Sequence, residues 1–379
     1  MLINNVYILA PQIWGAFFVI NFSVCATKNH KIYFVLHLLC FIFVINYKNR
    51  LIVPIFVNIQ KPTNIMSVID TLNSCDKTAF SFEVLPPIKG TGTSKLFGNI
   101  ERLMDFKPKY INITTHHSEP VYTDMGDGTY KRATIRRRPG TVAVATAIHH
   151  RFGVPVVPHI LCNGYSLEET EYVLIDLQLS GINNILVLRG DRCKEPSARC
   201  NSHTHAIDLL HQVNRFNEGF FIDGSQMKER GARFSCGVAC YPEKHEEAPN
   251  LESDLMVLKQ KADAGAEYAV TQMFFDNEKY FAFVERARAM GINIPIIPGI
   301  KPMHRLSQLN ILPKTFHVDL PVELVKAMRQ CKDDAAAAQV GREWAVAQCR
   351  ELIAKGVPGI HFYTINAMDS VYEIAKTIY

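Results

Sequence analysis

The first 65 residues contain no aspartate or glutamate, and the first acidic residue of the chain is Asp70. Five of the 41 basic residues lie in this stretch, so residues 66–379 carry 36 Lys and Arg against 36 Asp and Glu. A body with balanced charge lacks the basic surface that nucleic-acid binding requires. The sequence therefore predicts no nucleic-acid partner.

The ten cysteines include no Cys-x-x-Cys pair. Cys193 and Cys200 are seven positions apart, and Cys236 and Cys240 are four apart, without His or Cys partners in register for zinc. We therefore predict reduced thiols, as in a cytosolic protein, and no metal site. A glycine-rich dinucleotide fingerprint is also missing after every predicted strand, which disfavours a doubly wound Rossmann sheet, the second choice of fold.

Residues 1–65 contain two apolar runs, at 6–26 and 32–45. The first is broken by Pro11, and the second is short for a membrane helix of about 20 residues. Neither has the order of features of a secretory signal. Because the stretch is rich in Asn, Ile, Phe, Tyr and Lys, it resembles translated AT-rich non-coding DNA. We predict a non-homologous hydrophobic extension from a spurious upstream start, with Met66 as the true start; a membrane anchor is the alternative.

From Ala79 onward, short β-rich runs alternate with amphipathic helical stretches, which indicates βα units and a parallel sheet. The predicted strands are Ala79–Val84, Tyr110–Thr114, Pro155–Leu161, Asn184–Arg189, Arg233–Cys240, Glu267–Gln272, Ile294–Pro298 and Gly359–Tyr363. Several helical stretches end at a glycine that can adopt a left-handed turn, namely Gly181, Gly265, Gly291 and Gly356. Eight such units predict one (β/α)8 TIM barrel over residues 66–379.

Active sites of this fold lie where the strands end. The predicted strands end at or next to hydrogen-bonding side chains: Glu83, Thr114, His159, Asp191, Tyr241, Gln272, Lys301 and Tyr363. An inert barrel needs no such ring of polar groups, so we predict an enzyme with its site at this edge.

The motifs at these strand ends occur in one order along residues 79–379: Phe80-Ser-Phe-Glu-Val-Leu-Pro-Pro87, Pro158-His-Ile-Leu-Cys162, Leu188-Arg-Gly-Asp191, Tyr241-Pro-Glu-Lys-His245, Asp263-Ala-Gly-Ala266, Thr271-Gln-Met-Phe-Phe-Asp276, Ile297-Pro-Gly-Ile300 and His361-Phe-Tyr-Thr-Ile-Asn366. In these motifs the chain resembles the methylenetetrahydrofolate reductase family. The resemblance implies an oxidoreductase with non-covalent FAD that passes a hydride from NAD(P)H to 5,10-methylenetetrahydrofolate. The product, 5-methyltetrahydrofolate, feeds methionine synthesis. The resemblance further implies a cytoplasmic homo-oligomer.

The resemblance assigns catalysis to Glu83 and Asp191. Glu83 lies among apolar residues that should raise its pKa, and it would protonate the folate so that the ring opens to an iminium. The alternative for Glu83 is an ion pair with a barrel arginine. Asp191 would lie beside flavin and pterin, and a helix-capping role is its alternative.

The other site residues also follow from the resemblance. The FAD-binding set is Thr114, His159, Leu188, Arg189, Gly190, Asp191, His205, Ala206, Tyr241, His245, Asp254 and Lys261. The folate-binding set is Glu83, Asp191, Gln272, Gln308, Tyr363 and Ile365. Lys261 would neutralise the pyrophosphate, although a solvated helix face explains a lysine there nearly as well. Arg136, Arg137 and Arg138 resemble a phosphate patch, but we favour a solvated loop.

The sequence departs from the bacterial pattern at Gln260, where an Arg often holds the cofactor phosphates, and at Ala367, where a basic residue is usual. Because the chain stops at Tyr379, we expect no S-adenosylmethionine-binding regulatory domain. Two other functions stay open: a flavin-free pterin-binding barrel that transfers methyl groups, and a membrane-tethered scaffold without flavin.

Overall fold

The computed structural model describes residues 16–21, 39–46, 51–58, 66–116, 119–190 and 202–379. The chain divides into two units, Met1–Asn64 and Ile65–Tyr379. In the first unit, β1 (Ala16–Asn21), β2 (Leu39–Asn46) and β3 (Leu51–Asn58) form an antiparallel sheet in that order. In the part of the chain that the structure describes, no helix is both long enough and apolar enough to cross a membrane.

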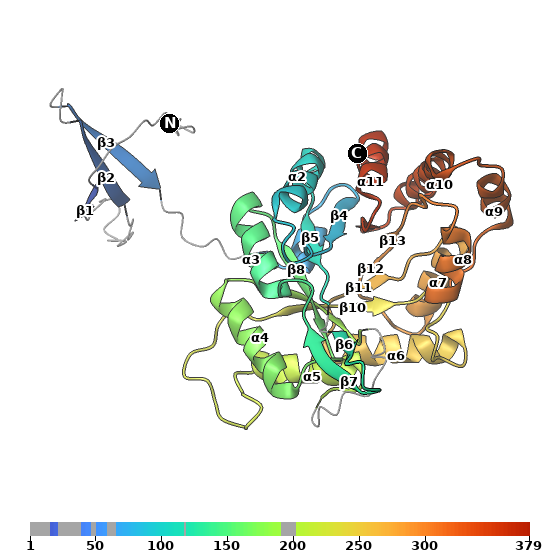
Figure 1. The fold of residues 1–379 in the computed structure, drawn as a ribbon, viewed down its shortest axis with the longest axis horizontal. Coiled ribbons are helices and arrows are strands. Elements are labelled where there is room, and N and C mark those ends of the chain that lie inside the picture. Colours follow the sequence, from blue (N-terminus) through green and yellow to red (C-terminus); the bar gives the residue numbers. More distant parts are fainter. Residues whose placement is uncertain (1–15, 22–38, 47–50, 59–65, 117–118, 191–201) are drawn as a thin grey trace. The chain divides into compact units, whose positions relative to one another are not determined.

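The second unit is built around parallel strands that follow the predicted order (Figure 1). These strands are β4 (Ala79–Val84), β5 (Tyr110–Ile113), β8 (Val156–Leu161), β9 (Asn184–Leu188), β10 (Ser235–Cys240), β11 (Tyr268–Thr271), β12 (Ile296–Ile297), β13 (Gly299–Ile300) and β14 (Gly359–Tyr363). Along the sheet they run β12-β11-β10-β9-β8-β5-β4-β14-β13.

The seventh predicted strand, Ile294–Pro298, is shorter than expected and broken in two. β12 pairs with β11, whereas β13 pairs with β14 on the other side. Pro298 lies between the two halves, and a proline has no N–H to donate to a neighbouring strand. Because the two ends of the sheet are halves of one interrupted strand, the sheet closes, and the predicted (β/α)8 barrel is confirmed.

Helices surround the barrel (Figure 1). They are α2 (Ser94–Leu103), α3 (Thr141–Phe152), α4 (Leu167–Leu179), α5 (Ala206–Asn217), α6 (Leu251–Asp263), α7 (Asn277–Ala289), α8 (Gln308–Phe316), α9 (Val322–Arg329), α10 (Asp334–Ala354) and α11 (Met368–Ile378). Gly181, Gly265, Gly291 and Gly356 follow the C-caps of α4, α6, α7 and α10 with positive φ, as predicted.

Side chains alternate between the two faces of each strand, and this alternation separates the core from the site. On β4, Phe80, Phe82 and Val84 belong to the main core, which also includes residues of the surrounding helices. Ala79 belongs to a second cluster that lines the barrel interior. Ser81 and Glu83 share its face of the strand, because every second residue points the same way. The barrel interior therefore receives the polar residues of β4.

The helix α1 (Val68–Asn73) closes the end of the barrel at which the strands begin. Val68 and Leu72 pack against interior residues that include Tyr110 and Tyr268. The Val68 N–H donates to Oδ1 of Asn184 at 2.9 Å, which fixes α1 to the start of β9. The end of the barrel at which the strands begin is therefore closed by residues that start just after Met66.

A chain that begins at Met66 is expected to fold and stay soluble, because it keeps α1. A chain that begins at Cys75 is the matched control, since it loses the burial of Val68 and Leu72. Each buried side chain of this size contributes about 1.5–3 kcal/mol, so the control should unfold several degrees earlier. Thermal unfolding measures both. Loss of folding in the Met66 chain would show that residues 1–65 belong to the enzyme.

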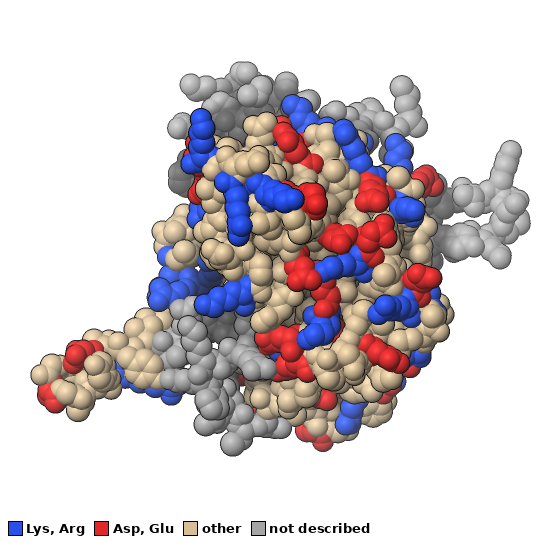
Figure 2. All heavy atoms as spheres, turned by 90° about the vertical axis from the view of Figure 1, so that its right-hand side faces the viewer, with Lys and Arg blue, Asp and Glu red and all other residues tan. Residues whose placement is uncertain are grey.

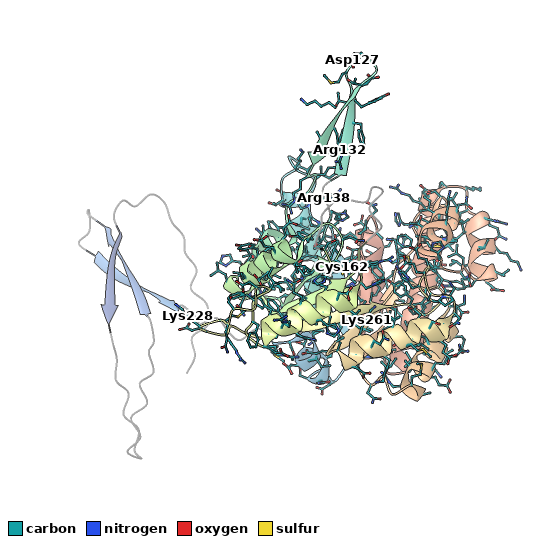
Figure 3. The ribbon with its side chains drawn as sticks, turned by 90° about the horizontal axis from the view of Figure 1, so that it is seen from below. Asp127, Arg132, Arg138, Cys162, Lys228 and Lys261 are labelled. Atoms are coloured by element: carbon teal, nitrogen blue, oxygen red, sulfur yellow. The ribbon has the colours of Figure 1, made fainter. Side chains whose placement is uncertain are left out.

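The sequence did not predict the hairpin of β6 (Glu119–Asp124) and β7 (Tyr130–Ile135), which lies between β5 and α3. The hairpin stands out from the barrel, with Asp127 at its tip and Arg138 at its base (Figure 3). The Asp124 and Asp127 carboxylates accept backbone N–H groups in the turn, at 2.8 and 2.9 Å. Arg136 and Arg137 are exposed, as in the favoured loop interpretation, whereas Arg138 is half-buried and donates to the Pro86 carbonyl.

Acidic and basic side chains are intermixed on the face at the right of Figure 1, which carries α8, α9 and α10 (Figure 2). Lys279 illustrates the pattern, because its Nζ pairs with both Glu243 and Asp319 at 2.5 Å. On this face no single sign of charge dominates, in keeping with the balanced charge of residues 66–379.

Candidate active site

Glu83, Tyr363 and Lys301 form a row at the mouth of the barrel. Tyr363 pairs with Glu83 in the register of β14 and β4, and Lys301 follows directly after the pair Ile300 and Phe362. Ile300 and Phe362 belong to the outer core, so the next residue of each strand points inward. The three side chains therefore enter the barrel mouth from three adjacent strands.

Burial dominates the electrostatics of Glu83. The residue is 5% exposed, and loss of water around the carboxylate raises its pKa to about 7. Lys301 opposes this change, because a nearby positive charge favours the ionised carboxylate. Among the described residues, no arginine pairs with Glu83, so the ion-pair alternative from the sequence is not supported. At neutral pH this carboxyl can both hold and release a proton.

A layer of neutral polar groups lies below this row. Ser81 Oγ lies 3.0 Å from Nδ1 of His361, and Asn112 Nδ2 lies 3.2 Å from Nε2 of His159. Burial lowers the pKa of each imidazole to about 3, with a smaller repulsion from His116 on His159 and from His159 on His361. Both rings are therefore neutral in the folded protein at physiological pH. His159 is buried and bonded to Asn112, and its contact with flavin stays a prediction.

A second polar cluster lies across the mouth, where β9 and β10 end. Arg189 forms ion pairs with Glu247 and with Glu246, the latter at 3.7 Å. Its Nη2 also lies 3.5 Å from Nε2 of His245, whose ring packs edge-on against Tyr241 with the centroids 4.7 Å apart. This cluster brings together four of the predicted FAD residues: Arg189, Tyr241, His245 and Asp254, which accepts the His245 N–H at 2.8 Å.

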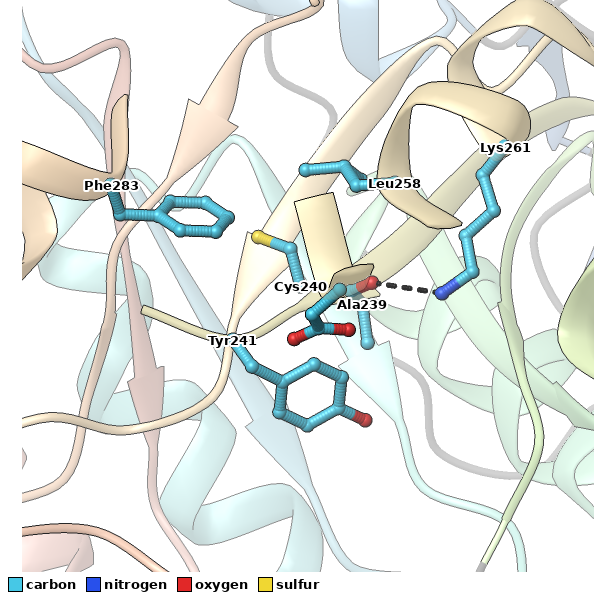
Figure 4. A pocket seen from close by; sticks show the side chains of 7 residues that line it. Ala239, Cys240, Tyr241, Leu258, Lys261 and Phe283 are labelled. Carbon is cyan, nitrogen blue, oxygen red and sulfur yellow. Dashed lines mark hydrogen bonds between the residues drawn. The ribbon is translucent and has the colours of Figure 1, made fainter. Parts of the chain in front are cut away.

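Lys261 extends from α6 toward the end of β10, where it lines a small pocket with Tyr241 and Asp254 (Figure 4). Its Nζ donates to the Ala239 carbonyl at 3.3 Å. Burial lowers the pKa of this amine, while Asp254 opposes the change. Lys261 is therefore half-buried and bound to a strand carbonyl, which favours a role at the site over a solvated helix face. Gln260, by contrast, is exposed on the same helix.

A sequence model described as methylenetetrahydrofolate reductase matches residues 43–379. The chain belongs to the methylenetetrahydrofolate reductase family. The 5,10-methylenetetrahydrofolate reductase of Escherichia coli (strain K12) is 31% identical over 299 residues, which cover 79% of this chain and 90% of that protein. The corresponding protein of Pectobacterium carotovorum is 32% identical, with 79% and 89% covered.

Eukaryotic relatives are longer. The probable methylenetetrahydrofolate reductase (NADPH) of Caenorhabditis elegans is 30% identical over 301 residues, which cover 79% of this chain and 42% of that protein. The chain thus spans less than half of this relative. Among solved structures, an uncharacterized protein from Clostridium thermocellum that binds two copies of 5-methyl-5,6,7,8-tetrahydrofolic acid aligns with a TM-score of 0.51. It is 15% identical, with 81% of this chain and 97% of that one covered, and it shows the fold alone.

The remaining residues that the family resemblance predicted have varied surroundings. Thr114 is buried, and its Oγ1 donates to the Val84 carbonyl at 3.3 Å. Leu188 and Gly190 end and follow β9, and Gly190 has a φ of +84° that favours glycine. His205 is the N-cap of α5 with 62% of its side chain exposed, while Ala206 behind it is buried. Asp191 lies outside the described residues.

On the folate side, two amides make local hydrogen bonds. Gln308 Oε1 accepts the N–H groups of His304 and Arg305 at 2.7 and 3.0 Å, and Gln272 Oε1 accepts the Met273 N–H at 3.0 Å. Tyr363 donates to the Thr271 carbonyl at 2.6 Å, and the Ile365 carbonyl accepts from Lys301. In this conformation the Gln272 and Gln308 carbonyls stabilise turns, and their NH2 groups are the parts suited to contact a ligand.

Sequence reasoning assigned no role to four interior residues: Ser81, Asn112, Tyr110 and His361. The alternation along β4, β5 and β14 could have identified them, because each lies two or four positions before a polar residue of the mouth. Lys301 was noted as a strand end, but nothing in the sequence connected it to Glu83.

Proposed function

We propose that this chain reduces 5,10-methylenetetrahydrofolate to 5-methyltetrahydrofolate, with FAD as cofactor and NAD(P)H as hydride donor. Membership of the family supports the reaction class. The observation that carries the proposal is Glu83, a buried carboxyl with a pKa of about 7 at the barrel mouth. A general acid works best when its pKa lies near the operating pH. We also propose that the enzyme is cytoplasmic and that its product supplies methyl groups for methionine synthesis.

The second polar cluster fits FAD. Lys261 is a half-buried cation that donates a hydrogen bond to a neutral carbonyl, so a pyrophosphate would stabilise its charged form. Arg189 adds a second cation at the end of β9. Gly190 follows it with a positive φ and has no Cβ, so a planar ring could approach the backbone closely there. Tyr241 and His245 pack edge-on against each other beside Arg189.

The cofactor and the residues of the mouth would have different roles in the reaction. Bound FAD would supply hydride transfer from the nicotinamide to the one-carbon unit of the folate. Glu83 would give its proton to the ring nitrogen that leaves the methylene carbon, so that the five-membered ring opens to an iminium. The C–N bond electrons stay on that nitrogen, and Glu83 becomes a carboxylate. His159 and His361, which lie below Glu83, are neutral and add no charge to this step.

An absorbance spectrum tests the proposal directly. The purified protein should be yellow, its flavin bands should bleach with NADH or NADPH without oxygen, and 5,10-methylenetetrahydrofolate should restore them. The alternative, a flavin-free pterin-binding methyltransferase, predicts a colourless protein. If the folate does not restore the bands of the bleached flavin, a different substrate must reoxidise the flavin.

Asp191→Asn is expected to slow both half-reactions while flavin remains bound. The substitution keeps the shape of the side chain and removes a negative charge that we place beside the isoalloxazine, so the flavin should become easier to reduce. A spectroscopic redox titration measures this as a more positive midpoint potential. An unchanged potential would show that Asp191 lies away from the ring.

A further inference from the structure

Lys301 and Glu83 are held at the same level of the barrel by strand pairing. Their strands are separated by β14, whose Tyr363 pairs with Glu83 directly. The Tyr363 hydroxyl does not bridge the two, because it donates to the Thr271 carbonyl on β11 at 2.6 Å. The two side chains, extending from either side of β14, can together cover much of the two strand spacings of about 4.8 Å each.

The backbone around the row keeps Lys301 in place. Its Nζ donates to the Ile365 carbonyl at 3.1 Å, on the loop that follows β14. Thr364 Oγ1, from the same loop, donates to the Glu83 carbonyl. The ammonium group and Glu83 are thus tied to one short segment, Thr364–Ile365. A nearby negative charge stabilises the charged form of a half-buried ammonium group whose hydrogen-bond acceptor is neutral.

Lys301 is the cation that faces Glu83 among the described residues. On the strands next to Glu83, the titratable groups are Lys301 after β13, Tyr363 and His361 on β14, Tyr110 and His116 on and after β5, and His159 on β8. Arg189, His245 and Asp254 lie across the mouth. His159 and His361 are neutral, and burial raises the pKa of Tyr110 and Tyr363 so that both are uncharged. The charge of Glu83 is therefore balanced by Lys301.

We propose that Lys301 is a positioning residue that stabilises the carboxylate of Glu83 after the proton has left, and so sets the pH range of folate reduction. This proposal rests on the proposed function, in which Glu83 is the proton donor. Proton release breaks the Glu83 O–H bond and forms an N–H bond on the folate, and it leaves an anion in a dry site. The Lys301 ammonium, held by the Ile365 carbonyl beside the row, can balance that anion.

Lys301→Met removes the charge and keeps much of the volume of the side chain. Without the cation the pKa of Glu83 rises, because burial is then unopposed. Folate reduction needs protonated Glu83, so its decline at high pH should move upward by about one pH unit or more. At the same time the rate at the low-pH plateau should fall, since the product carboxylate loses its partner. Lys301→Arg should restore the wild-type pH profile.

The measurements are stopped-flow rates of both half-reactions between pH 5.5 and 9, on the FAD-containing full chain. Reduction by the nicotinamide should keep its pH profile in Lys301→Met, which a general loss of structure would not allow. Lys326→Met is the control for net charge, because Lys326 is exposed on α9. An unmoved high-pH decline of folate reduction in Lys301→Met would overturn the proposal.

Infrared difference spectroscopy separates this proposal from the proposed function. The protonated-carboxyl band that is lost in Glu83→Gln reports the titration of Glu83 without turnover. If Lys301→Met moves this titration upward but not the pH profile of folate reduction, Glu83 is not the acid, and both the catalytic assignment and the role of Lys301 in it fail. If the titration does not move, only the role of Lys301 fails.

Discussion

Glu83→Gln is expected to slow the reduction of 5,10-methylenetetrahydrofolate by about 10²–10⁴-fold, the usual effect of losing a general acid. The glutamine is nearly isosteric with Glu83 but has no proton to deliver at neutral pH. Reduction of the flavin by NAD(P)H needs orientation of the two rings and no proton from Glu83, so its rate should change only modestly. Stopped-flow absorbance of the flavin measures the two half-reactions separately.

The contrast between the half-reactions makes the experiment decisive. Glu267→Gln is a matched control, because Glu267 pairs with Arg233 and Ser235 at the other end of the barrel. It should leave both rates within a few-fold of wild type. Equal slowing of both steps in Glu83→Gln would assign Glu83 a structural role in β4. Normal folate reduction would mean that another group supplies the proton.

The barrel could be predicted from the sequence because its signals are local and repeated. Seven of the eight predicted strands begin and end within about two residues of the predicted bounds, and glycines mark the ends of α4, α6, α7 and α10. The break at Pro298 was not predicted, because it depends on which neighbour each half-strand pairs with. The β6–β7 hairpin was missed as well, although Asp127-Gly128 between two β-rich runs is a known hairpin signal.

The site was predicted less completely, since a family motif names residues without their partners. Glu83, His159 and Lys261 lie at or near strand ends, but their predicted roles stay predictions, and the link between Glu83 and Lys301 joins segments more than 200 residues apart. Gln308 shows the opposite case, a residue that the motif named for the folate but that also has a role within the fold. Its carbonyl holds the turn at residues 304–305, a local role that the motif did not indicate.

The buried histidines give the second large prediction, a steep loss of stability in acid. His159 and His361 have their pKa lowered to about 3 by burial, whereas an unfolded histidine titrates at 6.5. Below pH 6.5 the unfolded chain therefore binds protons that the folded chain does not. Each histidine reduces the free energy of unfolding by about 1.4 kcal/mol per pH unit between pH 6.5 and 3. Their full contribution is present above pH 6.5.

Glu83 acts in the opposite direction over part of the same range. Its folded pKa of about 7 lies above the ordinary value of 4.5, so the folded chain binds the extra proton between these values. Its effect raises the free energy of unfolding as the pH falls from 7 to 4.5. Two histidines against one carboxyl leave a net loss of stability in acid, of about 1.4 kcal/mol per pH unit between pH 6 and 5.

Single substitutions should change the slope of the free energy of unfolding against pH in opposite directions. His361→Asn removes one titrating imidazole while keeping a polar group that can bond to Ser81, so the slope between pH 6 and 5 should fall close to zero. Glu83→Gln removes the opposing carboxyl, so the slope should roughly double.

Urea unfolding at several pH values measures the free energy of unfolding at each pH, and the slope against pH is the quantity to compare. His211→Asn, on the exposed face of α5, should keep the wild-type slope. If His361→Asn leaves the slope unchanged, the imidazole takes up protons inside the folded barrel, and the neutral layer beneath Glu83 is not neutral.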